Sequence, residues 1–249
     1  QVGDCAVVLA LATAFASRAC REGHSAITIE QIVAQARDAQ SLATALFPAA
    51  LQHGDDALWR QALSESPLVG DGSTLAPLVL RGDLLQLKRY HDAERRIAMR
   101  VQELTRASVD GGIPAFSIIT GGPGTGKTTF VAQRLVELST THPALRVALA
   151  APTGKAAARL TESIRQRLAQ ATGARVESFG DARTLHRLLG YSPATDCYRR
   201  NEADPLDDDL VIIDEASMVD VLMLDAVLRA LKPGARIMLV GDHHQLASV

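Results

Sequence analysis

The stretch FSIITGGPGTGKTT, residues 116–129, constrains the fold of this chain more than any other part of its sequence. Five strand-forming residues lead into the spacing Gly-x-x-x-x-Gly-Lys-Thr over residues 121–128, and helix-forming residues follow. A strand, a glycine-rich loop and a helix in this order predict a P-loop, whose backbone N–H groups and helix dipole hold a triphosphate. The alternative, a glycine-rich turn without a ligand, does not account for the complete pattern. The residues expected to line the phosphates are Gly121, Gly122, Pro123, Gly124, Thr125, Gly126, Lys127, Thr128 and Thr129.

Two carboxylates follow another apolar run and complete the chemistry that the P-loop begins. In LVIIDEASMVD, residues 210–220, Asp214 and Glu215 stand at the end of an expected strand. Lys127 is expected to neutralise the β- and γ-phosphates, while Thr128 and Asp214 ligate Mg²⁺. Glu215 is then placed to take a proton from an attacking water, which favours hydrolysis over transfer to a bound acceptor. Taken alone, such a pair is usually a helix N-cap.

A third apolar run ends in a polar loop, IMLVGDHHQLASV at residues 237–249. Asp242 and Gln245 are expected at the same sheet edge, Asp242 beside the nucleotide and Gln245 as a catalytic sensor of the γ-phosphate. The adjacent His243 and His244 have no third metal ligand at a fitting spacing, so we expect them in a solvated loop.

Short apolar runs recur along the second half of the chain, and their spacing predicts the fold class. Runs at 116–120, 146–150, 210–213 and 237–240 are typical of buried strands, and helical patterns follow the first three. Such alternation predicts an α/β fold in which helices cover both faces of a parallel sheet. Ligands of such folds bind at the carboxyl ends of the strands, which is where the P-loop and the carboxylates stand.

The part of the chain before residue 110 carries no recognisable catalytic group. Its first 80 residues are rich in Ala and Leu at helical spacing. The segment 75–87 predicts a β-hairpin around Gly82-Asp83, and a polar helix from about Lys88 to Arg106 follows it. We therefore expect a small, mainly helical N-terminal domain with a hairpin at 1–110 and an α/β domain at 111–249.

The net charge of −2 conceals an uneven distribution. Residues 146–200 carry ten Lys or Arg and four acids, whereas residues 201–225 carry nine acids and no Lys or Arg. Two helices are expected to begin inside the basic segment, each with a hydroxyl and a basic side chain at its start. Such a helix N-terminus can bind phosphate. Each could be simple helix capping, but with ten local cations they favour a nucleic-acid backbone. The residues expected at these contacts are Thr153, Lys155, Thr184 and His186.

Composition argues against several other classes. Cys5, Cys20 and Cys197 lie far apart without a zinc or disulfide pattern, so we expect a reducing cytoplasm. The apolar stretch from Cys5 to Ala16 is shorter than the roughly 18 residues of a membrane helix and has no basic leader. The sequence begins with Gln1 rather than Met and ends after a strand-like run, so we expect a piece of a longer protein.

Five segments, in this order, resemble the motifs of superfamily 1 DNA helicases: GGPGTGKTT, APTGKAAARL, TLHRLLG, VIIDEASMVD and VGDHHQLASV. They are similar to motifs I and Ia, a following DNA-contacting segment, and motifs II and III. Within that superfamily the sequence looks most like the RecD family, the alpha subunits of exodeoxyribonuclease V. GHSAITI and PLVLRGDLLQLKRYHDAERRIA also resemble the amino-terminal region of that family.

The resemblance implies a RecA-like motor domain of an ATP-dependent helicase that moves 5′ to 3′ on single-stranded DNA. It implies RecB-like and RecC-like partner subunits, with which such a protein unwinds and degrades broken duplex ends in recombinational repair. The N-terminal unit would then dock on the RecC-like partner. ATP and Mg²⁺ are the implied cofactors. The resemblance also implies a role for individual residues. Lys127 and Thr128 would bind phosphate and Mg²⁺, Asp214 would bind Mg²⁺, Glu215 would activate water, and Gln245 would sense the γ-phosphate. Thr153 and Lys155 would contact DNA.

The sequence differs from the family pattern in two places, and each difference leads to an expectation. The chain ends at motif III, without the arginine of a second motor domain, so we expect it to bind nucleotide without fast hydrolysis or unwinding. Family members also carry a Gln-containing helix that recognises adenine before the P-loop. Here only a short stretch with SVDGGIPA separates Arg106 from Phe116. We expect residues to be missing near Asp110 and Gly111, and Gln102 is the remaining candidate for adenine.

Three other functions remain open at this point. A subunit that holds nucleotide only for structure is disfavoured by the intact Lys127, Asp214 and Glu215. A stand-alone RecD-like or relaxase-linked helicase is expected to carry extra N-terminal DNA-binding hairpins, which the sequence does not show. A kinase would need an acceptor pocket, whereas the carboxylate pair suits water.

Overall fold

The structure, a computed structural model, describes residues 2–42, 56–107, 114–122, 124–170 and 180–242. These residues form two compact units, one up to Arg95 and one from Arg96 onward, so the division falls inside helix α4 (Lys88–Arg106). The domain boundary near residue 110 stays a prediction. None of the helices in these ranges combines the length and the apolar character that a membrane crossing requires.

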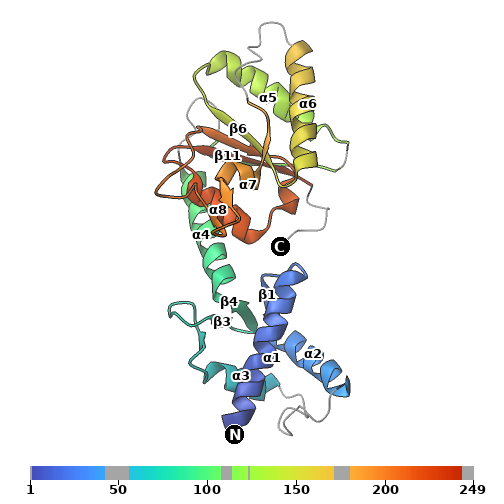
Figure 1. Ribbon diagram of the computed structural model, residues 1–249, viewed down its shortest axis with the longest axis vertical. Coiled ribbons are helices and arrows are strands. Elements are labelled where there is room, and N and C mark those ends of the chain that lie inside the picture. Colours follow the sequence, from blue (N-terminus) through green and yellow to red (C-terminus); the bar gives the residue numbers. More distant parts are fainter. Residues whose placement is uncertain (1, 43–55, 108–113, 123, 171–179, 243–249) are drawn as a thin grey trace. The chain divides into compact units, whose positions relative to one another are not determined.

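The first unit combines helices with a small sheet of order β1-β4-β3-β2. The hairpin predicted from the sequence is present, with antiparallel strands that pair Leu80 with Leu85 and turn at Gly82-Asp83. The sequence does not predict β1 or β2, because strands of two or three residues leave no alternation to detect. The elements of this unit are α1 (Val2–Arg21), β1 (Ala26–Thr28), α2 (Ile29–Leu42), α3 (Asp56–Ser64), β2 (Val69–Gly70), β3 (Leu78–Arg81) and β4 (Leu84–Leu87) (Figure 1).

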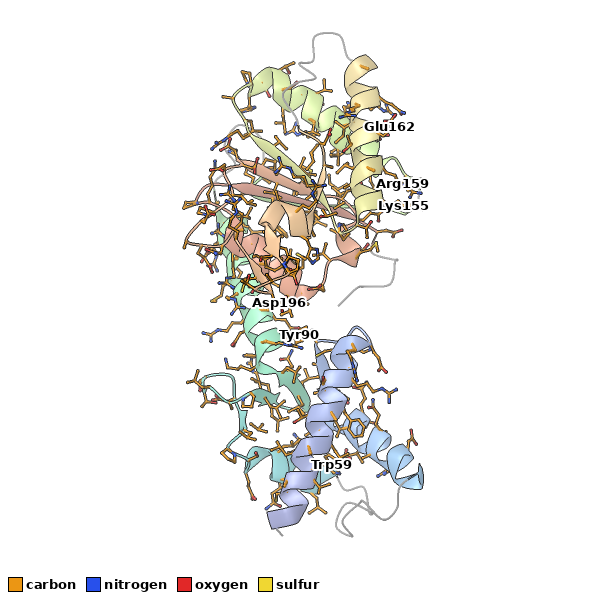
Figure 2. All side chains as sticks on the ribbon, in the orientation of Figure 1. Trp59, Tyr90, Lys155, Arg159, Glu162 and Asp196 are labelled. Atoms are coloured by element: carbon orange, nitrogen blue, oxygen red, sulfur yellow. The ribbon has the colours of Figure 1, made fainter. Side chains whose placement is uncertain are left out.

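Trp59 on α3 is the largest side chain in the core of the first unit (Figure 2). Only 1% of its surface is exposed, and Leu63, one turn further along α3, is fully buried. Apolar residues of α1, α2 and the hairpin pack against this pair. The burial of one face of each helix therefore closes the first unit around α3.

Replacing Trp59 with alanine is expected to lower the free energy of unfolding of this unit by about 3–5 kcal/mol, since a large buried aromatic leaves a cavity. Urea unfolding followed by circular dichroism measures the change. The matched control is Leu58→Ala on the same helix, whose side chain is 44% exposed and whose loss is expected to cost less than about 1 kcal/mol. Equal costs for the two variants would contradict this description of the core.

The second unit contains a five-stranded, fully parallel sheet of order β5-β11-β10-β6-β7. The α/β fold and the four strands predicted from apolar runs are confirmed, with ends that differ by no more than one residue. The fifth strand, β7, is two residues long and is not predicted. The elements are β5 (Phe116–Thr120), α5 (Lys127–Thr141), β6 (Val147–Ala151), α6 (Gly154–Gln170), β7 (Arg183–Thr184), α7 (Leu185–Leu189), β8 (Tyr191–Ser192), β9 (Cys197–Tyr198), β10 (Leu210–Ile213), η4 (Ala216–Met218), α8 (Val221–Ala230) and β11 (Arg236–Gly241).

Helices cover both faces of this sheet, as the sequence predicts (Figure 1). On one face α5 and α6 pack on β6, β10 and β11, where Leu135 and Leu160 are fully buried. On the other face α7, α8 and Leu104 of α4 pack on the same strands. Successive strand residues point to opposite faces, so Val211 joins one core and Ile212 the other. The carboxyl ends of β5, β6, β10 and β11 meet at one edge, which positions the candidate site.

Candidate nucleotide-binding site

The P-loop connects β5 to α5 through glycines that the backbone requires. Gly124 and Gly126 have φ values of 74° and 84°, a region that side chains rarely allow. A Cβ at Gly121 would lie 2.6 Å from Oγ1 of Thr125, so this position has no room for a side chain. Gly126 caps α5 without a side-chain hydrogen bond, unlike the caps of α7 and α8. The first turn of α5 thus keeps backbone donors for an anion.

Lys127 lies over the loop that precedes it. Its Nζ donates hydrogen bonds to the carbonyl oxygens of Gly121 at 2.5 Å and Gly122 at 2.9 Å. Hydrogen bonds from an ammonium to a phosphate oxygen are stronger than those to a neutral carbonyl. The ammonium can therefore exchange these carbonyls for phosphate oxygens without moving far.

Asp214 is held at the carboxyl end of β10. Its N–H donates to the carbonyl of Ala150 at 2.9 Å, and its carboxylate accepts the N–H of Glu215 at 3.0 Å. The residue is 9% exposed. Burial raises the pKa of Asp214 above its usual value, although the Glu215 N–H, Lys127 and the hydroxyl of Thr128 act in the opposite direction. A bound cation would remove the cost of burying this charge.

Glu215 adopts a backbone conformation that is unusual for its type. Its φ of 54° lies in the left-handed region, at a cost of order 1–3 kcal/mol, and it caps the 3-10 helix η4. Across from η4, a Cβ at Gly241 would come within 3.1 Å of the Ser217 nitrogen, so β11 approaches this turn closely. Asp242 follows β11 and is 1% exposed. These close contacts fix the position of the Glu215 backbone.

One pocket of about 420 Å³ collects side chains from three different connections of the sheet. Thr128 comes from the start of α5, and Asp214 and Glu215 come from the end of β10. Thr153 and Lys155, which the sequence suggests for DNA, line the same pocket. The structure therefore brings one pair of the expected DNA contacts next to the residues expected at the phosphates.

The donor chemistry of this pocket fits Mg²⁺. The Thr128 hydroxyl and the Asp214 carboxylate line the same pocket, and the hydroxyl acts to lower the pKa of Asp214. Magnesium is usually held by one or two protein oxygens, with water and substrate phosphates completing its shell. Among the described residues there is no group of three or more His, Cys, Asp or Glu that could hold a metal without such help.

A second groove, of about 570 Å³, lies on another face of α6. It is bounded by α6, β7 and α7, and it contains Thr184 together with Arg183 and Arg187. The Thr184 hydroxyl accepts the N–H of Arg187 at 3.3 Å, and the Thr153 hydroxyl accepts the N–H of Ala156 at 3.2 Å. Both threonines are thus helix caps, and each hydroxyl keeps its own hydrogen to donate.

His186 is exposed and packs with two tyrosines of the β8–β9 hairpin. Its ring centroid lies 5.3 Å from that of Tyr191 and 6.1 Å from that of Tyr198. The Tyr191 hydroxyl donates to Asp196 at 2.7 Å. This cluster ties the hairpin to α7, and the role of His186 in DNA binding stays a prediction.

Several expected positions lie outside the described residues: Pro123, Gln245, His243, His244, Asp110 and Gly111. Gln102 is exposed on α4. The sequence reasoning missed Arg159, which lines the 420 Å³ pocket. Its spacing of four residues from Lys155 on a predicted helix could have revealed it.

Asp214→Asn is expected to stabilise the nucleotide-free protein at neutral pH and therefore to raise its Tm. The amide avoids the cost of a buried charge and still accepts the Glu215 N–H. Because the folded-state pKa of Asp214 is raised, the gain is full above that value and disappears as the pH falls toward 3.8, the ordinary value. Thermal scans at two pH values measure it. A lower Tm for Asp214→Asn would contradict this explanation, and Asp181→Asn, in an exposed ion pair, is the control.

Comparison with known proteins places this geometry in a family. A family model described as "AAA domain" matches residues 107–249. A second model, described as "RecBCD enzyme subunit RecD, N-terminal domain", matches residues 2–85. The chain therefore belongs to the AAA-domain family of P-loop proteins. Within that family it is a relative of RecD.

Curated relatives also relate the chain to RecD. The RecD subunit of Mycolicibacterium smegmatis is 38% identical over 272 aligned residues, which cover 96% of this chain and 46% of that protein. The ATP-dependent RecD2 DNA helicase of Deinococcus radiodurans is 45% identical over 133 residues, which cover 53% of this chain and 16% of that protein. The chain thus spans less than half the length of these relatives. The 272 aligned residues also exceed the 249 of the chain, so the M. smegmatis protein has residues without a counterpart here.

Among solved structures, the chain is similar to one described as "Structural Basis for DNA Unwinding at Forked dsDNA by two coordinating Pif1 helicases". The TM-score is 0.36 at 24% identity, over 64% of this chain and 34% of that one.

Proposed function

We propose that this chain is the N-terminal part of an ATP-dependent DNA helicase subunit of the RecBCD type, containing its first motor domain. The observation that carries the proposal is the single pocket that joins Thr128 of the P-loop to Asp214 and Glu215. A P-loop with an adjacent metal-directed carboxylate and a second, partly exposed carboxylate is the arrangement that nucleotide hydrolysis requires.

The residues divide the chemistry among them. Lys127 and the first turn of α5 bind the β- and γ-phosphates, in place of the carbonyls that Lys127 contacts in the structure. Thr128 and Asp214 hold Mg²⁺, which supplies charge neutralisation between the phosphates when bound. Glu215 accepts the proton of the attacking water at its carboxylate. Gln245, which follows β11 in the sequence, is proposed to sense the γ-phosphate.

The proposed DNA path uses the basic groove beside α6. Arg183, Arg187 and Thr184 line it, and cations with hydroxyl groups are the usual partners of a nucleic-acid backbone. Thr153, Lys155 and His186 are proposed as further contacts of the same strand.

The proposed partners are RecB-like and RecC-like subunits, because the relatives that match 96–97% of this chain are RecBCD enzyme subunits. The match of residues 2–85 to the RecD N-terminal domain supports docking through the first unit. A stand-alone helicase is the second candidate, favoured by the 45% identity to the RecD2 helicase over 53% of the chain. A pull-down of the full-length protein with a RecC-like subunit separates the two, since only the first candidate predicts binding.

Strand displacement by the full-length protein tests the proposed activity. A duplex with a 5′ single-stranded tail is expected to be unwound with ATP and Mg²⁺, and a duplex with a 3′ tail is not. Unwinding from the 3′ tail alone would contradict the direction, and equal unwinding without ATP would contradict the motor assignment. Competition between ATP and GTP in the same assay reports whether adenine is recognised.

A further inference from the structure

Helix α6 carries four cationic side chains, and their contacts divide them into two pairs. Arg165 is in an ion pair, and Arg167 donates a hydrogen bond to Thr129 at 3.0 Å. Lys155 and Arg159 have neither an ion pair nor a hydrogen bond to any other residue that the structure describes. A long cationic side chain without a partner inside the chain is free to bind an anion.

The unpartnered pair faces the catalytic pocket. Lys155 and Arg159 are four residues apart on α6, which puts them on one face of the helix (Figure 2). Both line the 420 Å³ pocket. Thr128, Asp214 and Glu215 line the same pocket. The pocket therefore contains two cations without an intramolecular partner among the described residues, together with the residues that would bind Mg²⁺ and activate water.

Arg159 is better suited than Lys155 to a phosphate in this position. Its guanidinium presents donors in a planar fork that matches two phosphate oxygens at once, whereas an ammonium acts as a point charge. The P-loop already supplies one ammonium, Lys127, which reaches the loop side of the phosphates. A group arriving from α6 would approach the phosphate that points away from the P-loop.

We propose that Arg159 is a further phosphate-contact residue, which binds the terminal phosphate of a bound nucleoside triphosphate. The inference rests on the proposed function, because it needs a nucleotide at the P-loop. It adds a cation within this motor domain that distinguishes triphosphate from diphosphate.

The same contact links the nucleotide to the DNA groove. The face of α6 that carries Ala157, Thr161 and Arg165 lines the 570 Å³ groove, while the Arg159 face lines the nucleotide pocket. We expect α6 to move as one body, so that a phosphate bound at Arg159 changes the width of the groove. By linkage, single-stranded DNA in the groove must change the affinity for triphosphate by the same factor.

Equilibrium binding of two Mg²⁺-nucleotides, ADP and a non-hydrolysable ATP analogue, tests the proposal on the 249-residue chain. Arg159→Gln is expected to weaken the triphosphate about tenfold or more, as the loss of a charge-assisted hydrogen bond does, and to leave ADP within about twofold. Arg159→Met, which keeps the apolar stem, is expected to match Arg159→Gln, and Arg159→Lys to recover part of the affinity. Arg134→Gln, which removes a cation from an ion pair on α5 outside both pockets, is the control and is expected to change neither affinity.

The second readout is the affinity for a single-stranded oligonucleotide with each nucleotide bound. The ratio between the triphosphate and diphosphate states is expected to differ from one in the wild type and to approach one in Arg159→Gln. Equal weakening of ADP and the analogue, or no change in either, would overturn the proposal. If the wild type binds neither nucleotide, or Lys127→Gln binds both as the wild type does, the proposed function itself fails.

Discussion

Glu215→Gln in the full-length protein is expected to lower the rate of DNA-stimulated ATP hydrolysis by about 100- to 10,000-fold, the usual contribution of a general base. Glutamine has nearly the same shape and cannot accept the proton of the attacking water. Asp214, Thr128 and Lys127 stay in place, so nucleotide affinity is expected to remain within about threefold. Steady-state phosphate release, with nucleotide binding measured on the same preparation, checks both parts.

The control for this variant is Glu137→Gln, which removes a carboxylate from an exposed ion pair on α5. It is expected to leave hydrolysis unchanged, because exposed pairs contribute little. Hydrolysis by Glu215→Gln at the wild-type rate would remove Glu215 from the mechanism. Loss of nucleotide binding would instead show that Glu215 contributes to binding rather than to the chemical step alone.

Lys127→Gln is expected to weaken the binding of Mg²⁺-nucleotide by about 10- to 100-fold, since charged hydrogen bonds contribute about 1.5–3 kcal/mol each. The lost contacts are those that its ammonium makes with phosphate oxygens in place of the Gly121 and Gly122 carbonyls. The side chain is half-buried and its partners lie in its own loop, so we expect Tm to change by less than about 3 °C. Titration with a fluorescent nucleotide measures the affinity, and thermal scans measure stability.

Arg134→Gln, further along α5 in an exposed ion pair, is the matched control and is expected to bind as the wild type does. A Lys127→Gln variant with unchanged affinity would show that the glycine-rich loop does not hold the phosphates.

The features that the sequence predicts well depend on local pattern. The P-loop spacing fixes a strand, a loop and a helix within fourteen residues, and the structure has β5 and α5 at those positions. The hairpin at Gly82-Asp83 and the helix Lys88–Arg106 are predicted for the same reason, since a turn and an amphipathic period are both local. The parallel order of the sheet follows from alternation of strands and helices.

The roles of individual side chains on α6 are harder to predict. The sequence places Thr153 and Lys155 at the start of a helix, but it does not show whether they line the 420 Å³ pocket or the 570 Å³ groove. That depends on how β6 lies between β10 and β7, a long-range arrangement. For the same reason the sequence separates Arg159 from Asp214 and Glu215 by more than fifty positions, whereas the fold brings them into one pocket.

The candidate site also has features that reduce stability, and no motif reveals them. Asp214 is buried with a raised pKa, and Glu215 has a left-handed backbone. Only the folded backbone shows them, together with the close approach of Gly241 to η4. Local strain and a buried charge at one point are what a site for a metal and a reactive water requires.

The rate of ATP hydrolysis by the full-length protein, with and without single-stranded DNA, tests the central claim most directly. We predict that DNA stimulates hydrolysis by the wild-type protein and that Lys127→Gln has no stimulated activity. An unchanged rate in Lys127→Gln, or a wild-type rate that DNA does not alter, would contradict the assignment of this chain to a DNA-driven nucleotide motor.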